Sequence, residues 1–295
     1  MTLDTELITL PDGRRFDLFV GGAPDGLGLI AHHGTPGDAS RFAAWDEAAR
    51  RHGLRLVTFS RPGYATSTRL PGRSVADVAD DVVAIADRLG IGEFVSIGGS
   101  GGGPHSIACA ALLPERCLAA AAMVTVAPYG APGLDWFDGM AQINLDEFGA
   151  ALEGEETLRA WMAGEGEEYR QVTGEQLAAS LGEAIPEVDR AVLTGDEAEK
   201  QAAGIRRALE HGFDGWVDDD LAFARPWGFA LDTITRPVRI WQGELDRLVP
   251  VSHGRWLADQ IPGARFAMAP GMGHFSLPIA HRDAILEDLL SEARA

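Results

Sequence analysis

The sequence predicts an α/β protein with a mostly parallel, doubly wound sheet into which a block of helices is inserted. Short β-rich runs alternate with amphipathic helical patterns in the first 127 residues, and the alternation resumes at Pro237. Between Pro128 and Leu231 the pattern is helical, with 22 acidic against 7 basic residues and a net charge of −15. A G-x-S-x-G turn centred on Ser100 joins a β-rich run to a helical one. We expect a first part of the core, a helical cap and a second part of the core at 1–127, 128–231 and 232–295.

The β-rich runs predict the strands of one sheet. Two of them flank the turn Pro11-Asp12-Gly13, which is typical of an antiparallel pair. The runs that follow are short and apolar, and several are bounded by glycine, as in buried parallel strands. The expected strands are Leu7–Leu10, Phe16–Val20, Leu27–Ala31, Leu54–Phe59, Phe94–Ile97, Ala119–Val126, Val238–Gln242 and Ala264–Ala269.

Helical spacing of apolar residues predicts the helices. After residue 74, Val78, Val82 and Ile85 recur at this spacing, and we expect the aspartates of this stretch, including Asp81, to face solvent. The expected helices are Arg41–Arg51, Val75–Leu89, one that follows Ser100, Glu155–Ala163, Gly174–Ile185, Asp196–Glu210, Gly254–Ile261 and Ile279–Ala293.

The composition excludes several classes of protein. The chain has 295 residues, of which 46% are hydrophobic and 23% charged, as in a globular protein. Its net charge of −19 repels phosphate backbones and anionic lipids, so we expect neither nucleic-acid nor membrane partners. The first residues lack the pattern of a signal peptide, and no apolar stretch is long enough to span a bilayer. We therefore expect a cytoplasmic protein, and a homodimer is left open.

The two cysteines are too few for a disulfide framework. Cys109 and Cys117 are therefore expected to be small core residues in a reducing compartment. The adjacent His32 and His33 have no carboxylate or thiolate partner at metal-ligand spacing, so we expect no metal site.

Ser100 is the residue whose setting points most directly to chemistry. A serine on a sharp turn between a strand and a helix sits in strained backbone, and Gly98 and Gly102 let the two elements pass closely. Asp246 follows the next-to-last predicted strand, and His274 follows the last one. The order Ser100, Asp246, His274 is the one expected for a nucleophile, acid and base on this architecture. The backbone N–H of Gly101 would then contribute to an oxyanion hole.

Five motifs in this order resemble the α/β-hydrolase family across nearly the whole chain. His33-Gly34-Thr35-Pro36-Gly37 is similar to the HGxPG oxyanion loop of the family. The segment 61–67 resembles its RPGYGxS loop, with Ala65 in place of a glycine, and 243–250 resembles its G-x-x-D-x-x-V-P acid loop. The other two motifs are the serine turn and the histidine after the last strand.

The resemblance implies roles for individual residues. It places Thr35 as the second oxyanion donor, favours Asp246 over Glu244 as the acid, and implies no cofactor. We expect His33 to brace the oxyanion loop and His105 to lie in or beside the helix after Ser100. The remaining histidines are expected at the surface or an interface: His52, His211, His253 and His281.

A serine hydrolase that cleaves a carboxylic ester is the leading interpretation. Trp136 and Phe137 are expected in an apolar substrate pocket, and the run Asp218-Asp219-Asp220 on a solvated face, or alternatively near a cationic substrate. Three alternatives stay open. They are an aminopeptidase of the proline-iminopeptidase type, a cofactor-free perhydrolase or haloperoxidase, and a small-molecule receptor on the same fold.

Overall fold

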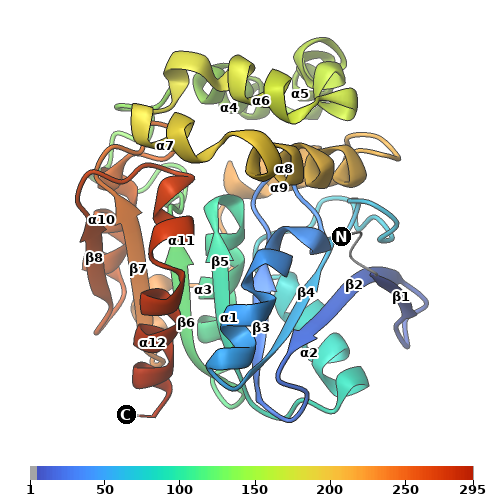
Figure 1. Cartoon of the computed structure of the whole chain (residues 1–295), viewed down its shortest axis with the longest axis vertical. Coiled ribbons are helices and arrows are strands. Elements are labelled where there is room, and N and C mark those ends of the chain that lie inside the picture. Colours follow the sequence, from blue (N-terminus) through green and yellow to red (C-terminus); the bar gives the residue numbers. More distant parts are fainter. Residues whose placement is uncertain (1–4, 295) are drawn as a thin grey trace.

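The computed structural model describes residues 5–294, and its core is an 8-stranded sheet in the order β1-β2-β4-β3-β5-β6-β7-β8 (Figure 1). β2 pairs antiparallel with β1 and with β4, and the pairs from β4 to β8 are parallel. The predicted α/β architecture is confirmed. The strands are β1 Glu6–Thr9, β2 Arg15–Gly22, β3 Leu27–His32, β4 Leu54–Phe59, β5 Phe94–Gly99, β6 Cys117–Met123, β7 Val238–Gly243 and β8 Arg265–Ala269.

Helices cover both faces of this sheet. α1 and α12 pack on one face against alternate residues of the central strands, such as Leu29 and Val95. α2, α3 and α10 pack on the other face, against residues such as Ile30 and Phe94. This division follows from the two-residue period of a strand, which sends successive side chains to opposite faces. The helices are α1 Asp46–Arg51, α2 Val78–Leu89, α3 Gly103–Leu112, α10 Val251–Gln260, α11 Ser276–Ala280 and α12 Arg282–Ala293.

A helical cap lies over the carboxyl edge of the sheet, between β6 and β7 in the chain (Figure 1). It has its own cluster of buried apolar side chains, which includes Leu158, Ala202 and Val217. The cap helices fall within the expected range 128–231, and α4, α7 and α9 were not anticipated. The cap helices are α4 Gln142–Glu153, α5 Glu155–Trp161, α6 Gly174–Leu181, α7 Glu187–Val192, α8 Gly195–Ala208 and α9 Asp214–Phe223.

The structure shortens or divides several expected helices, among them α5, which ends at Trp161, and α6, which ends at Leu181. The stretch 41–51 is a 3-10 helix, Ala39–Trp45, followed by α1. α2 begins at Val78 rather than Val75, and the expected C-terminal helix is divided at His281 into α11 and α12.

Three expectations about exposure are wrong. The aspartates 218–220 are buried in α9, where Asp218 and Asp219 pair with arginines of the core and Asp220 lies beside Glu147. Asp81 is buried beside Arg14, whose Nη1 lies 2.6 Å from its carboxylate. His253 is fully buried, because it bridges two elements: its Nδ1 bonds the N–H of Ala127 and its Nε2 lies 2.9 Å from the carbonyl oxygen of Trp136.

Both cysteines are buried and unpaired within the core, as expected. Among residues 5–294, no helix has the length and apolar character that crossing a membrane requires.

Candidate active site

Ser100 sits at the turn between β5 and α3 with a backbone φ of 54°, in the left-handed region that side chains disfavour. The glycines around it are required by close approach. A side chain on Gly98 would overlap the carbonyl oxygen of Gly102, and one on Gly102 would overlap that of His32. The sharp turn therefore depends on these glycines, as the sequence predicted, and it directs the Ser100 side chain away from the sheet.

His274 and Asp246 lie on the loops after β8 and β7 and contact each other. Nδ1 of His274 is 2.9 Å from Oδ2 of Asp246, while Oδ1 of Asp246 accepts hydrogen bonds from the N–H groups of Leu248 and Val249 at 3.0 and 2.9 Å. Glu244, the alternative acid, is exposed and accepts a bond from the N–H of Gly271 instead. The fold thus brings Asp246, and not Glu244, to the histidine.

The contact with Asp246 changes the proton affinity of His274. Burial lowers the pKa of His274, but the Asp246 carboxylate raises it by more, so the pKa lies above the usual 6.5. Burial also raises the pKa of Asp246, against the opposing effect of His274. With Nδ1 engaged by Asp246, the other ring nitrogen is the one available to a substrate or to Ser100.

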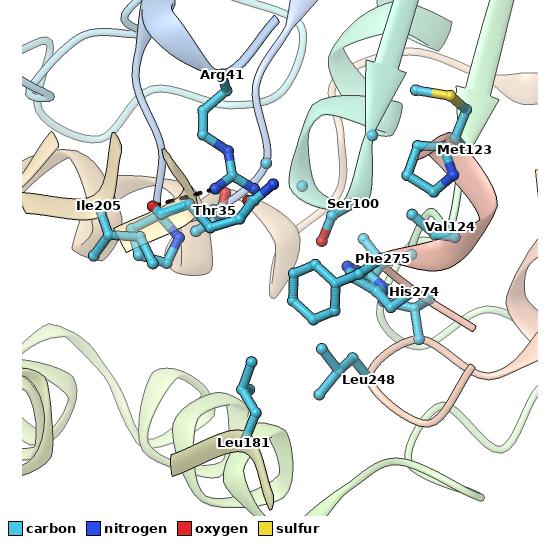
Figure 2. Close-up of a pocket in the computed structure, with 18 of the residues that line it drawn as sticks. Thr35, Arg41, Ser100, Met123, Val124, Leu181, Ile205, Leu248, His274 and Phe275 are labelled. Carbon is cyan, nitrogen blue, oxygen red and sulfur yellow. Dashed lines mark hydrogen bonds between the residues drawn. The ribbon is translucent and has the colours of Figure 1, made fainter. Parts of the chain in front are cut away.

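Ser100 and His274 line one cavity of about 230 Å³ beneath the cap. Figure 2 shows the two side chains turned toward each other within it. No hydrogen bond joins them in the part of the chain that the structure describes. Such bonds are often long in structures without substrate and tighten when substrate binds.

Thr35 and Gly101 lie against each other beside Ser100. A side chain on Gly101 would overlap Oγ1 of Thr35, and one on Gly34 would lie 3.3 Å from Cβ of Ser100. Within the described chain, no protein group accepts a hydrogen bond from the N–H of Thr35. The N–H of Gly101 lies at the start of the helical turn, where backbone donors lack partners within the helix. Two backbone donors are therefore available where the sequence predicted them.

The hydroxyl of Thr35 is engaged by the cap. Oγ1 donates to Oδ2 of Asp219 on α9 at 2.7 Å and accepts from Nη2 of Arg61 at 3.1 Å. The single proton of the hydroxyl is therefore committed to Asp219 and is not directed at Ser100.

Asp219 is the centre of a fully buried network of charged and polar groups. Its carboxylate accepts from Arg61, Arg73 and the hydroxyl of Tyr64, with the two shortest contacts at 2.6 Å. Burial by itself would raise the pKa of Asp219, but the two guanidinium groups outweigh it and hold the pKa well below its usual value. The network fastens a cap helix to the loop after β4 and, through Thr35, to the oxyanion loop.

The buried histidines near the site are neutral and structural. Nδ1 of His33 lies 2.7 Å from the carbonyl oxygen of Gly34, and its Nε2 accepts from the N–H of Arg61, so His33 braces the oxyanion loop as expected. His105 is buried in α3, also as expected, with Nδ1 2.9 Å from the carbonyl oxygen of Gly101. Burial, together with the charge of Arg61, lowers the pKa of both histidines well below 6.5.

Asp189 is a site residue that sequence reasoning missed. It lies on cap helix α7 with no exposed surface, and its carboxylate accepts from the N–H groups of His274, Phe275 and Ser276 at 2.7, 3.2 and 2.8 Å. It also accepts from the Ser276 hydroxyl at 2.6 Å. The loop that carries His274 is therefore held by a cap residue 85 positions earlier in the chain, and no local pattern could indicate this.

The wall of the cavity is mostly apolar, but it is not the wall that the sequence predicted. Trp136 and Phe137 are absent from it, which corrects the expectation. Trp136 is buried behind the cavity, where its Nε1 donates to the carbonyl oxygen of Ala127 at 2.7 Å and its ring packs on Phe148. Phe148 does line the cavity, with Val126 and Phe223. Five further apolar residues of the wall are labelled in Figure 2: Met123, Val124, Leu181, Ile205 and Leu248.

Two cap carboxyl groups face the same cavity. Glu147 on α4 accepts from Nε1 of Trp216 at 2.6 Å, and Asp220 on α9 is fully buried beside it. Burial raises the pKa of both groups, and the neighbouring charge of Glu147 raises that of Asp220 further. Within residues 5–294, no group of three or more His, Cys, Asp or Glu side chains is placed to hold a metal ion.

Comparisons with known proteins agree with this architecture. The family model described as "alpha/beta hydrolase fold" matches residues 29–279. The chain is 25% identical to the bifunctional esterase/perhydrolase DCH of Acinetobacter calcoaceticus, over 98% of this chain and 99% of that one. It is 26% identical to the putative carbamate hydrolase RutD of Caulobacter sp. (strain K31), over 96% of this chain and 97% of that one.

Solved structures show the same fold at lower identity. A hydrolase from Pseudomonas aeruginosa PA01 superimposes with a TM-score of 0.71 at 21% identity, over 100% of both chains. An enol-lactonase from Burkholderia xenovorans LB400 superimposes with a TM-score of 0.69 at 18% identity, over 98% of this chain and 100% of that one. The family model alone spans most of the chain. The chain belongs to the α/β-hydrolase family.

Proposed function

We propose that this hydrolase cleaves a carboxylic ester of a small, largely apolar substrate through an acyl-enzyme on Ser100. The observation that carries the proposal is the shared cavity. Ser100 faces His274 there, His274 contacts Asp246 at 2.9 Å, and two backbone donors lie beside the serine. This is the set of groups that acyl transfer to a serine requires.

Each group has a defined part in the reaction. His274 takes the proton of the Ser100 hydroxyl as the oxygen attacks the ester carbonyl, and the N–H groups of Thr35 and Gly101 bind the oxyanion. His274 then gives that proton to the leaving alcohol and activates the water that releases the acid. Asp246 holds the imidazole in the required tautomer and stabilises the imidazolium.

Perhydrolysis is the second candidate, because a relative that matches nearly the whole chain is named an esterase/perhydrolase. In that reaction hydrogen peroxide takes the place of water, attacks the same acyl-enzyme and releases a peracid. The two activities are compared by measuring peracid and acid formed from one ester with and without added peroxide.

Replacement of Ser100 tests the proposal. We expect Ser100→Ala to lower ester turnover by about 10⁴-fold or more, because the nucleophile is lost, while the fold is retained. Intact mass after treatment with a fluorophosphonate should show one adduct on the wild type and none on Ser100→Ala. Ser291→Ala, an exposed serine on α12, is the matched control and should keep both turnover and adduct. Turnover that survives in Ser100→Ala contradicts the proposal, and a wild type that neither turns over nor reacts favours the receptor interpretation.

A further inference from the structure

Arg41 places a positive charge in the cavity wall without a carboxylate partner. It lies on the 3-10 helix Ala39–Trp45, directly after the oxyanion loop, and Figure 2 shows its side chain directed into the cavity that Thr35 and Ser100 also line. Its one hydrogen bond, from Nη1 to the carbonyl oxygen of Gln201, is 3.4 Å long. Among the described residues, no carboxylate oxygen lies within 4.0 Å of its guanidinium.

The nearest acidic groups are committed elsewhere. Asp38 pairs with Nε of Arg207 at 3.0 Å, and Glu197 accepts from the side-chain amide of Gln201 at 2.9 Å. Both are near enough to raise the pKa of Arg41, but burial outweighs them and lowers it. A half-buried guanidinium without a carboxylate partner has lost part of its hydration in the free protein, which points to a partner that arrives with the substrate.

Gly204 of the cap leaves room for the Arg41 side chain, whereas the contact with Gly37 is an ordinary one. A side chain on Gly204, inside α8, would lie 2.9 Å from Cδ of Arg41, and one on Gly37 would lie 3.4 Å from its Cγ. Glycine inside a helix destabilises that helix relative to alanine. The absence of a side chain at Gly204 in α8 therefore leaves room for Arg41.

A second arginine lines the same cavity. Arg282, at the start of α12, donates from Nη1 to the carbonyl oxygen of Ala44 at 2.7 Å and packs over the ring of Trp45. Its Nε is buried without a partner in the described structure. Two half-buried arginines, neither of which has a carboxylate oxygen within 4.0 Å among the described residues, thus line one cavity in a chain whose net charge is −19.

We propose that Arg41, supported by Arg282, binds a free carboxylate on the substrate, so that the preferred substrate is an ester with a second, unesterified carboxyl group. The inference rests on the proposed ester hydrolysis and adds one charged group to its substrate. Guanidinium donors form a planar fork that matches a carboxylate in two parallel hydrogen bonds. A negative protein surface repels anions, so their binding requires such a local positive site.

Paired substrates test the proposal. Monomethyl glutarate carries the carboxylate in its acyl part, and methyl pentanoate is its neutral counterpart. Acetoxyacetate carries it in the alcohol part, with ethyl acetate as the neutral counterpart. We expect the wild type to favour the charged member of at least one pair in kcat/KM, measured by titrating the released acid at constant pH.

Removal of the charge should remove this preference. Arg41→Gln is expected to lower the ratio of charged to neutral kcat/KM by about 10- to 100-fold, mainly through KM, since hydrogen bonds to a charged group are lost. Arg88→Gln, an exposed arginine on α2, removes the same charge far from the cavity and should leave the ratio unchanged. A wild type without preference in either pair, or an unchanged ratio in Arg41→Gln, overturns the proposal while ester hydrolysis stands.

A binding measurement separates this proposal from the proposed function. Calorimetric titration of Ser100→Ala with monomethyl glutarate should show binding. The double variant Ser100→Ala/Arg41→Gln should show no binding of the same ester. If no ester is turned over by the wild type but this binding depends on Arg41, the carboxylate site stands and ester hydrolysis fails. The carboxylate site is overturned if Ser100→Ala binds neither monomethyl glutarate nor acetoxyacetate. It is also overturned if the double variant with Arg41→Gln binds them as well as Ser100→Ala does.

Discussion

His274 is the residue on which pH acts most directly in the proposed reaction. As general base it must be neutral, and the Asp246 carboxylate raises its pKa above 6.5 against the opposing effects of burial and of the Arg41 charge. A raised pKa means that activity is lost as the pH falls through that higher value. The acid limb of the pH profile therefore reports on the contact between these two side chains.

We expect kcat/KM of the wild type to fall on acidification with an apparent pKa above 6.5. Asp246→Asn removes the charge that raises this pKa, so the acid limb should move to lower pH and the residual kcat/KM should be lower by on the order of 10³- to 10⁴-fold. The measurement is a pH profile of ester turnover. Glu244→Gln is the control, since Glu244 contacts Gly271 and not His274. A limb that moves in Glu244→Gln and stays in Asp246→Asn contradicts the assignment of the acid.

The burial of the three consecutive aspartates of α9 could not be predicted from the neighbouring residues alone. Asp218 bonds Arg69 at 2.8 Å, Asp219 bonds Arg61 and Arg73, and Asp220 lies beside Glu147, whose charge helps to raise its pKa. A run of acidic residues predicts a solvent-exposed face when only its own segment is considered. Its burial depends on partners that lie more than 70 positions away in the sequence.

At the scale of elements, motifs confined to a short stretch were predictable and contacts between distant stretches were not. The strands, the Ser100 turn and the positions of Asp246 and His274 after successive strands follow from local patterns, because parallel strands end at the same edge of a sheet. The cavity wall does not. Phe148 of α4 reaches it, whereas Trp136, on which the Phe148 ring packs, does not, and this contact joins two segments that local patterns treat separately.

The contact between Asp189 of helix α7 and the loop that carries His274 is the clearest example of two distant stretches brought together. The charge of Asp189 contributes to the raised pKa of His274, and its oxygens accept the backbone N–H groups of the histidine loop. Asp189 is a positioning residue, because in the proposed mechanism it acts through His274 and not on the substrate.

We expect Asp189→Asn to lower kcat/KM by about tenfold or more, because a displaced catalytic group loses much of its effect. It should also move the acid limb to lower pH, since the charge that helps to hold the proton on His274 is gone. A purely structural role would lower activity without this shift. Glu187→Gln removes an exposed charge from the same helix and is expected to change neither quantity. An unshifted limb in Asp189→Asn would falsify the positioning role.

At the scale of the molecule, the cap is fastened to the core at several buried points rather than resting on it. Arg61 and Arg73, from the loop after β4, pair with Asp219 of α9 at 2.6 Å. Arg207 of α8 pairs with Asp17 of β2 and Asp38 at 3.1 and 3.0 Å, and Asp189 holds the loop after β8. Removing one member of a buried ion pair leaves an uncompensated charge in the protein interior.

This arrangement predicts that the cap and the core unfold together. Four of the seven tryptophans lie between residues 128 and 231. Tryptophan fluorescence therefore reports mainly on the cap, whereas circular dichroism reports on the secondary structure of the whole chain. In urea both signals should give one coincident transition. Asp219→Ala should move that transition to lower urea by about 3–5 kcal/mol in the free energy of unfolding, and both signals should move together.

Asp214→Ala is the matched control for this prediction, because Asp214 lies on the same helix and also pairs with arginine, but is 45% exposed. An exposed pair contributes about 1 kcal/mol or less, so this variant should unfold close to the wild type. If fluorescence instead changes at lower urea than circular dichroism, the cap melts while the sheet persists, and the buried pairs do not join the two. A single shifted transition in Asp219→Ala means that the residues that hold the oxyanion and histidine loops in place also make the molecule one cooperative unit.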